Sequence, residues 1–425
     1  MRDFPSYNSE KIFITGQNKL YGKVKISGAK NAALPLMALS LIINNGFTLS
    51  NVPDLADTRL MSSLLNDLGI EMQWQNGNID FNGTPKKDEA SYELVRKMRA
   101  SILVLGPLLV SKGSAKVPLP GGCAIGSRPI DLHVMVMESL GAKIIFDSGF
   151  IIGSVGPEGL RGGIINFPKV SVGATESAIM TAVLAKGQTK IINAAQEPEI
   201  TDLSNCLVNA GADIKGIGTN TIIINGVDYL NKVEYGVVSD RIEAGSFAIA
   251  SSLTMGNVEI DNINPKNLER FLKVLKYTGS EIEVSKNAIN VSSSIRPKAV
   301  NIVTEPHPGF PTDLQAQYMT LMSIADGKTF IKETIFENRF MHVPELMRMG
   351  AKISVNNEEA IVTGVRKLKG SKVMASDLRA SMSLILGALV ASGTSEIDGI
   401  FHLDRGYENL EHKLSNLGAN VKRSV

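Results

Sequence analysis

The chain has 425 residues, 44% of them hydrophobic and 20% charged, which is enough to bury cores in two or three globular domains. This composition excludes disordered and fibrous proteins, and the net charge of +2 argues against a protein that coats nucleic acid or a membrane. Two cysteines without zinc spacing indicate a reducing compartment and no metal. Residues 1–11 lack the apolar segment of a secretory signal, and each apolar run is shorter than the roughly 20 residues of a membrane span, so we expect a cytoplasmic protein.

A short sequence pattern recurs along the chain: a small or apolar residue, Gly, any residue, a polar residue and then Ile, Val or Met. Six copies of one repeating unit therefore fill the chain. Their glycines are Gly69, Gly141, Gly211, Gly279, Gly350 and Gly418, spaced by 72, 70, 68, 71 and 68 residues.

Each copy is predicted to begin with a helix that is apolar almost all round, and therefore buried, and that ends at a glycine suited to a left-handed cap. A short strand follows, then an amphipathic surface helix such as 202–210, whose apolar stripe includes Cys206. Two alternating strands, for example 351–355 and 360–364, complete the copy. The predicted buried helices are 32–43, 102–110, 178–185, 247–255, 315–325 and 382–391, and the closing glycines are Gly46, Gly113, Gly187, Gly256, Gly327 and Gly393.

The two ends of the chain each carry half of a copy. The first copy begins with an unpartnered strand, 11–16, and the last copy stops after one strand, 419–425, so we expect these two strands to pair. The chain would then cross between two domains near 27–30 and 236–240. The sequence thus predicts an α/β protein of two similar three-copy domains, with sheets outside and apolar helices inside. The expected domains are 30–237, and 1–29 together with 238–425.

A charged residue stands at or just before the start of each predicted buried helix. Five of the six are cations, although the helix dipole favours anions at this end, so they indicate unfilled anion sites. Solvated charges paired with neighbours such as Asp240 and Asp377 are the alternative. The single acid, Asp313, is a candidate general base, and a simple N-cap is its competing interpretation. The cations are Lys30, Arg99, Lys169, Arg241 and Arg379.

The stretch from Leu119 to His133 is rich in Gly and Pro, which predicts an exposed loop. Cys123 lies near its tip. Beside Arg128, its thiol is a candidate proton donor or nucleophile. Cys206, on the apolar stripe of a helix, is instead expected to be a buried small hydrophobe.

Six segments, in order along the chain, carry a family resemblance: Ser27 to Pro35, Met98 to Ser101, Pro120 to Pro129, Pro308 to Asp313, Glu337 to His342 and Asp404 to Glu408. They resemble the enolpyruvyl transferases, and among them the UDP-N-acetylglucosamine 1-carboxyvinyltransferases. The resemblance implies a pseudo-sixfold pair of inside-out α/β barrel domains and no metal or organic cofactor. The chain departs from the family pattern in its longer polar N-terminus and at Glu176-Ser177.

The reaction implied by this resemblance joins the enolpyruvyl group of phosphoenolpyruvate to the 3′-hydroxyl of UDP-N-acetylglucosamine and releases phosphate, at the first committed step of peptidoglycan synthesis. Cys123 would be the acid and Asp313 the base. Lys30, Arg128 and Arg405 would hold the phosphate and carboxylate of phosphoenolpyruvate, with help from Arg339 and Arg379. The implied contacts of the nucleotide sugar are Asn31, Arg99, Arg128, Pro129, Ile130, Asp131, Leu132, Lys169, Val170, Ser171, Val172, Asp313 and Ile335.

Two other functions stay open. A sister enzyme of the same architecture transfers the enolpyruvyl group to shikimate 3-phosphate, but the Cys123 loop and the segment 308–313 fit the nucleotide-sugar enzymes better. A repeat scaffold without catalysis would instead have polar, interchangeable helix starts. The expected partners are the two small-molecule substrates, without nucleic acid or membrane, and the expected state is a monomer.

Overall fold

The computed structural model describes residues 10–43, 46–121 and 130–424. These residues divide into two compact units. The terminal unit contains the described residues up to Ser27 and from Ser239 onward, and the central unit contains those from Gly28 to Val238. Each unit is built around its own hydrophobic core. Within the described ranges, no helix is long and apolar enough to cross a membrane.

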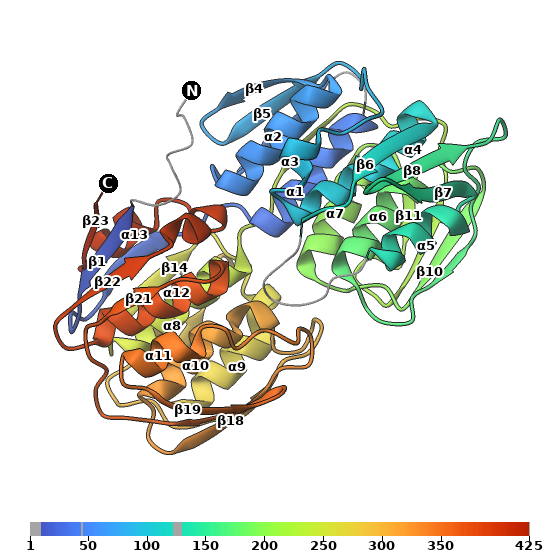
Figure 1. Ribbon diagram of the computed structural model, residues 1–425. Helices are drawn as coiled ribbons and strands as arrows, with labels where there is room; N and C mark the ends of the chain where they lie inside the picture. The colour runs from blue at the N-terminus through green and yellow to red at the C-terminus, as the bar shows by residue number, and fades with distance from the viewer. Residues whose placement is uncertain (1–9, 44–45, 122–129, 425) are drawn as a thin grey trace. The chain divides into compact units, whose positions relative to one another are not determined.

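Three helices fill the middle of the terminal unit (Figure 1): α8 (Arg241–Leu253), α10 (Gln315–Ser323) and α12 (Leu378–Val390). They contact one another pairwise. Every residue of α8 and of α10 is buried, because apolar and small side chains occur on all sides of these helices. Three further helices bury one face each: α9 (Glu269–Tyr277), α11 (Val343–Arg348) and α13 (Leu410–Asn416).

Sheets cover the helices of the terminal unit on the outside (Figure 1). The described strands form three four-stranded sheets, with the orders β21-β22-β1-β23, β15-β16-β14-β2 and β17-β18-β20-β19. The strands are β1 (Lys11–Thr15), β2 (Tyr21–Lys25), β14 (Asn257–Asp261), β15 (Glu281–Val284), β16 (Ala288–Ser292), β17 (Ile302–Val303), β18 (Lys328–Lys332), β19 (Lys352–Asn356), β20 (Glu359–Thr363), β21 (Lys372–Met374), β22 (Thr394–Asp398) and β23 (Asn420–Ser424).

The two ends of the chain share one sheet, as the sequence predicts. Strand β1 lies antiparallel to β23, with Lys11 opposite Ser424, and antiparallel to β22, with Ile12 opposite Ile397. Its inward side chains, Ile12 and Ile14, are no more than 1% exposed. The expected pairing of the chain ends is therefore confirmed.

The central unit repeats this plan. Its middle holds α1 (Lys30–Ala38), continued by η1 (Leu39–Leu41); η2 (Arg99–Val104), continued by α4 (Leu105–Lys112); and α6 (Val172–Ala182). The helices α2 (Ala56–Leu68), α3 (Tyr92–Val95), α5 (Asp131–Ser139) and α7 (Pro198–Asn209) complete its helical part.

The described strands of the central unit form sheets in the orders β13-β3-β5-β4, β11-β12-β10-β9 and β6-β8-β7. They are β3 (Phe47–Ser50), β4 (Glu71–Gln75), β5 (Asn78–Asn82), β6 (Ser114–Pro118), β7 (Ala142–Asp147), β8 (Phe150–Val155), β9 (Ile164–Asn166), β10 (Gln188–Ile192), β11 (Asp213–Lys215), β12 (Thr221–Asn225) and β13 (Val233–Gly236).

The glycines that define the sequence repeat follow the six surface helices α2, α5, α7, α9, α11 and α13. All six have φ between 92° and 106°, in the left-handed region that favours glycine. The repeat therefore marks the same structural position six times. The buried helices differ from expectation at Gly256, because Met255 takes the left-handed conformation with φ of 50°. Glycine is required at 256 for another reason: a Cβ there would lie 2.1 Å from the carbonyl oxygen of Leu20.

Candidate functional site

The six charged residues singled out in the sequence all lie at or just before the start of a helix in the middle of a unit. Lys30, Arg99 and Arg241 are the first residues of α1, η2 and α8, and Arg379 is the second residue of α12. Lys169 lies shortly before α6, and Asp313 lies in η4 (Thr312–Leu314), which leads into α10. Three of them therefore belong to the central unit and three to the terminal unit.

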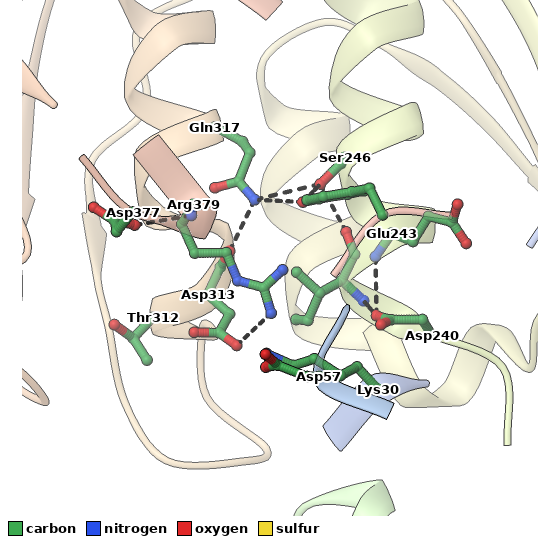
Figure 2. A network of polar contacts seen from close by, with 12 residues as sticks. Lys30, Asp57, Asp240, Glu243, Ser246, Thr312, Asp313, Gln317, Asp377 and Arg379 are labelled. Carbon is green, nitrogen blue, oxygen red and sulfur yellow. Dashed lines mark hydrogen bonds and ion pairs between the residues drawn. The ribbon is translucent and has the colours of Figure 1, made fainter. Parts of the chain in front are cut away.

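Asp313 lies between two buried arginines of the terminal unit. Its Oδ1 accepts a hydrogen bond from Arg339 Nη2 at 2.5 Å, and its Oδ2 accepts one from Arg379 Nη2 at 2.7 Å; Figure 2 shows the second contact. The arginine side chains are 4% and 7% exposed, whereas the carboxylate is 24% exposed. The N-cap residues of η4 and α10 are Pro311 and Leu314, so Asp313 does not occupy the N-cap position of either helix.

Arg379 is a fixed positive charge at the start of α12. Its backbone N–H donates to the N-cap residue Asp377 at 2.8 Å, while its side chain turns to Asp313. Burial alone would lower the pKa of the guanidinium, but the charge of Asp313, the influence of Tyr407 and Asp240, and the hydrogen bond to Asp313 together raise the pKa above its ordinary value. The guanidinium carbon also lies 6.0 Å from the centre of the Tyr407 ring. The Arg379 side chain is therefore buried and paired with Asp313, and the alternative of a solvated charge paired with Asp377 is wrong.

A buried polar network fixes the backbone of Asp313. Gln317 Nε2 donates to the Asp313 carbonyl oxygen at 2.9 Å, to Tyr407 Oη at 3.2 Å and to Ser246 Oγ at 3.3 Å. Figure 2 shows Gln317 between Asp313 and Ser246. Ser246 and Gln317 are fully buried, and Tyr407 is 3% exposed. This network was not predicted from the sequence, although a glutamine in a helix that is otherwise apolar all round is a signal for buried polar partners.

Glu333 connects the backbone near Ile335 to the residue before Asp313. Its Oε2 accepts from Thr312 Oγ1 at 3.0 Å, and its Oε1 accepts from the backbone N–H of Ile335 at 2.9 Å. Glu333 is 1% exposed, so these hydrogen bonds satisfy a buried charge. The structure thus links Ile335 to Thr312, the neighbour of Asp313, through a carboxylate that was not recognised in the sequence.

Arg405 ends η5 (Ile400–Arg405), two residues before Tyr407. It is partly buried. The pKa of the neighbouring His402 is lowered, first by burial and then by the charge of Arg405. The positive charge of Arg405 therefore disfavours the protonated form of His402 in the same helix.

In the central unit, Lys30 and Asn31 open α1. Lys30 Nζ lies 3.4 Å from Asp57 Oδ2 in the first turn of α2 (Figure 2), and the two side chains are 14% and 6% exposed. Asp57 also was not recognised in the sequence, because an acid in the first turn of a helix is common and needs no ligand.

A buried histidine, His133, lies near Arg99 and the starts of α5 and α6. Its Nδ1 lies 2.8 Å from Ser177 Oγ of α6, and a Cβ on Gly173 would come within 3.3 Å of its ring. Burial, followed by the charge of Arg99, lowers the pKa of His133 to about 4, so the ring is neutral near pH 7. Arg99, the start of α5 and the start of α6 therefore lie around one buried imidazole.

The stretch from Leu119 to His133 is only partly a loop. Helix α5 begins at Asp131, and Leu132 and His133 are 6% and 8% exposed. Leu132 belongs to the core of the central unit, whereas Asp131 is exposed and Ile130 half-buried. The expectation of a loop as far as His133 is thus wrong, because the apolar face of α5 outweighs the nearby Gly and Pro signals.

The segment before α6 is the most open of the predicted contacts. Lys169 is exposed, and Val170, Ser171 and Val172 are half-buried. Ser171 is the N-cap of α6, with its Oγ accepting from the backbone N–H of Ala174 at 3.4 Å. The exposed backbone start of this helix is suited to an anionic group.

Three predicted residues, Cys123, Arg128 and Pro129, lie outside the described residues. Cys206 is fully buried on α7, and burial raises the pKa of its thiol, as expected for a small hydrophobe. In the part of the chain that the structure describes, no group of three or more His, Cys, Asp or Glu side chains could hold a metal ion.

One family matches nearly the whole chain. The family model described as EPSP synthase (3-phosphoshikimate 1-carboxyvinyltransferase) matches residues 14–414. A UDP-N-acetylglucosamine 1-carboxyvinyltransferase from Zymomonas mobilis subsp. mobilis is 50% identical over 422 residues, which are 97% of this chain and 99% of that protein. A protein of the same name from Acinetobacter baylyi is 51% identical over 416 residues, with the same coverage.

Solved structures show the same fold. The enolpyruvyl transferase NikO from Streptomyces tendae has a TM-score of 0.89 at 23% identity, over 98% of this chain and 99% of that one. EPSP synthase from Acinetobacter baumannii has a TM-score of 0.76 at 18% identity, over 98% of this chain and 100% of that one. The predicted fold class is confirmed by these similarities.

Proposed function

We propose that this chain, which belongs to the EPSP synthase family of 1-carboxyvinyltransferases, transfers the enolpyruvyl group of phosphoenolpyruvate to the 3′-hydroxyl of UDP-N-acetylglucosamine and releases phosphate. The observation that carries this proposal is identity of about half the residues, over 97% of the chain, with enzymes named for that nucleotide sugar. The solved EPSP synthase is only 18% identical, so shikimate 3-phosphate is the less favoured acceptor.

The proposed reaction needs fixed positive charge, an acid and a base. A proton from the Cys123 thiol goes to the methylene carbon of phosphoenolpyruvate, and the electron pair of its double bond forms the new C–H bond. The sugar oxygen then bonds to the electron-poor neighbouring carbon, while its proton passes to Asp313. Finally the C–O bond to phosphate breaks, with its electron pair leaving on the phosphate oxygen, as the former methylene carbon returns a proton to the Cys123 sulfur, which restores the double bond and the thiol.

The geometry around Asp313 supports a base that acts late in bond formation. Hydrogen bonds from Arg339 and Arg379 favour the ionised carboxylate, which makes it available but weakly basic. A hydroxyl group becomes much more acidic as its oxygen bonds to an electron-poor carbon, so a weak base is sufficient at that stage. The same buried guanidiniums add positive charge beside the anions of phosphoenolpyruvate.

One assay tests the proposal: phosphate release from phosphoenolpyruvate with UDP-N-acetylglucosamine as acceptor, in parallel with shikimate 3-phosphate, and with EDTA present in both. We expect release only with the nucleotide sugar. Release only with shikimate 3-phosphate would transfer the proposal to the sister reaction, and no release with either acceptor would favour a scaffold. We also propose that the enzyme acts as a monomer in the cytoplasm, which light scattering of the purified chain and cell fractionation test.

A further inference from the structure

A cationic pocket of about 330 Å³ lies in the terminal unit, where the start of α8 meets η3 (Pro265–Leu268), α9 and the loop before η4. Its charged lining comes from Arg241 of α8, Lys266 of η3, and Glu269, Arg270 and Lys273 of α9, and His307 of the loop adds an imidazole. Arg241 is the one helix-start cation that the proposed reaction does not use. The cation at the start of α8, to which the proposed reaction assigns no role, thus lines this pocket.

Three of the cations that line this pocket form no ion pair with any described carboxylate. Glu269 is the acidic residue of the lining. In the described parts of the chain, no carboxylate forms an ion pair with Lys266, Arg270 or Lys273, whereas surface lysines elsewhere in this unit do pair, for example Lys332 with Glu359 at 3.1 Å. Like charges gathered without partners repel one another, so stability alone does not favour this arrangement.

The first residue of α8 adds to the positive potential. Arg241 is 9% exposed and lies where the helix dipole already places partial positive charge. Its N-cap neighbour Asp240 uses Oδ1 to accept from the backbone N–H groups of Ile242 and Glu243, at 2.7 and 3.0 Å. Asp240 therefore caps the start of α8.

The walls of the pocket are preformed. Phe271 of α9 is 1% exposed and its ring packs on that of Phe310, with centroids 5.9 Å apart. The loop 305–310 is closed by a hydrogen bond in which the backbone N–H of Glu305 donates to the Phe310 carbonyl oxygen at 3.0 Å. Gly309 leaves no room for a side chain, because a Cβ there would lie 2.4 Å from Glu305 Cβ. An apolar base under a cationic rim can hold a ligand without large rearrangement.

We propose that this pocket is a binding site for a small phosphorylated molecule, separate from the two proposed substrates. Guanidinium and ammonium groups bind phosphate oxygens strongly, and a pocket of about 330 Å³ is at the small end of the range for such ligands. Pro311 lines the pocket and is also the N-cap residue of η4, which carries Asp313. A bound phosphate group would therefore lie close in the chain to the proposed base.

Pyrophosphate is the probe for the test, which uses calorimetric titration and hydrogen exchange on the full chain. The test variant, Arg270→Gln with Lys273→Gln, removes two exposed cations of the pocket. The control, Lys276→Gln with Lys286→Gln, removes the same charge from exposed positions of the same unit that do not line the pocket. Neither pair belongs to the proposed catalytic machinery, so both variants should keep normal turnover.

We expect the test variant to bind pyrophosphate at least about 10-fold more weakly than the wild type, and the control to bind it normally. Pyrophosphate should also slow amide exchange at 266–273 and 307–311 in the wild type. Equal affinity of the test variant and the wild type would overturn the site, and so would equal losses in both variants. Protection only around Asp313 and Arg379 would show binding at the proposed substrate site instead, whatever the outcome of the activity assay.

Discussion

The backbone N–H of Asp240 donates to the carbonyl oxygen of Ser27 at 2.9 Å, although the two residues lie far apart in the sequence. Just beyond them, the backbone N–H of Ala29 donates to the carbonyl oxygen of Val238 at 2.7 Å. Within the described ranges, these four residues flank the points at which the chain passes between the units. The two crossing segments are therefore joined by hydrogen bonds at both ends.

A buried ion pair holds Ser27 in place. Glu243 Oε2 accepts from the Ser27 backbone N–H at 2.9 Å, and Glu243 Oε1 accepts from Lys413 Nζ at 2.6 Å. The Glu243 and Lys413 side chains are 2% and 15% exposed. Burial raises the pKa of Glu243 to about 7, even though Lys413 opposes the rise, which shows how much this carboxylate depends on its partner.

Lys413→Met should therefore destabilise the terminal unit by about 3–5 kcal/mol, because it leaves a buried carboxylate without its cation. Adding Glu243→Gln to that variant should recover part of the loss. Denaturant unfolding with hydrogen exchange in each unit would measure both effects. A double variant that is as unstable as the sum of its single variants would contradict the coupling.

Asp313→Asn should lower turnover by about 10² or more while changing the affinity for UDP-N-acetylglucosamine much less. The amide keeps the shape and loses the proton acceptor. The variant should also be less stable, because Arg339 and Arg379 remain buried without their counter-charge. Steady-state kinetics and thermal unfolding measure the two effects, with Asp326→Asn, an exposed acid of the same unit, as control. Turnover close to normal would leave Asp313 only a charge partner for the arginines.

Cys123→Ser should be nearly inactive, whereas Cys123→Asp should keep measurable activity. A hydroxyl group is too weak an acid to protonate carbon near neutral pH, but a carboxyl group in an apolar site can have its pKa raised enough to do so. Phosphate release measures the activity, and binding of UDP-N-acetylglucosamine checks that both variants fold. If the Asp variant binds the sugar yet is as inactive as the Ser variant, a covalent bond to sulfur becomes the better account.

Glu176→Gln should reduce the loss of stability of the central unit at alkaline pH. Burial, with the charges of Glu199 and Glu197 adding to it, raises the pKa of Glu176 from 4.5 to about 8. Between these values the folded chain holds a proton that the unfolded chain has released. The contribution of Glu176 to stability is therefore fully present below about pH 4.5 and is lost as the pH rises towards about 8.

The measurement is the free energy of unfolding of the central unit at about pH 6, 7 and 8, where Glu176 accounts for a slope of at most about 1.4 kcal/mol per pH unit. The range starts at about pH 6 because burial raises the pKa of Asp202, in the same unit, to about 6. The exposed Glu138→Gln variant should keep the wild-type slope. The same slope in Glu176→Gln would show that Glu176 is not the titrating group.

The sequence predicts the repeating architecture because each copy carries local signals. The glycines Gly69 to Gly418 recur at the position where the chain needs positive φ, and the apolar runs identify which helices are buried. The start of α5 at Asp131 was missed because Gly and Pro upstream suggested that the loop extended further. Local signals therefore predict elements better than they predict where those elements begin.

The partners within the candidate site depend on long-range contacts that no local pattern contains. The sequence places Asp313 and Arg379 at helix starts, but their pairing joins residues 66 positions apart. Glu333 was missed because its partner Thr312 lies 21 positions away, and Asp57 because an acid in the first turn of a helix is common. In the terminal unit, the mutual packing of α8, α10 and α12 brings Ser246 to Gln317 and Arg379 to Asp313.

The position of β1 between β22 and β23 also orders events during synthesis on the ribosome. Residues 28–238 can form the whole central unit before either neighbour of β1 has been made, because Lys11 and its partner Glu396 are 385 positions apart. Until then β1 is a strand with two open edges, and such edges attract other chains. Residues 394–424 therefore complete a sheet that contains residues 11–15, and a nascent chain stalled shortly before residue 394 would keep β1 available to chaperones or to aggregation.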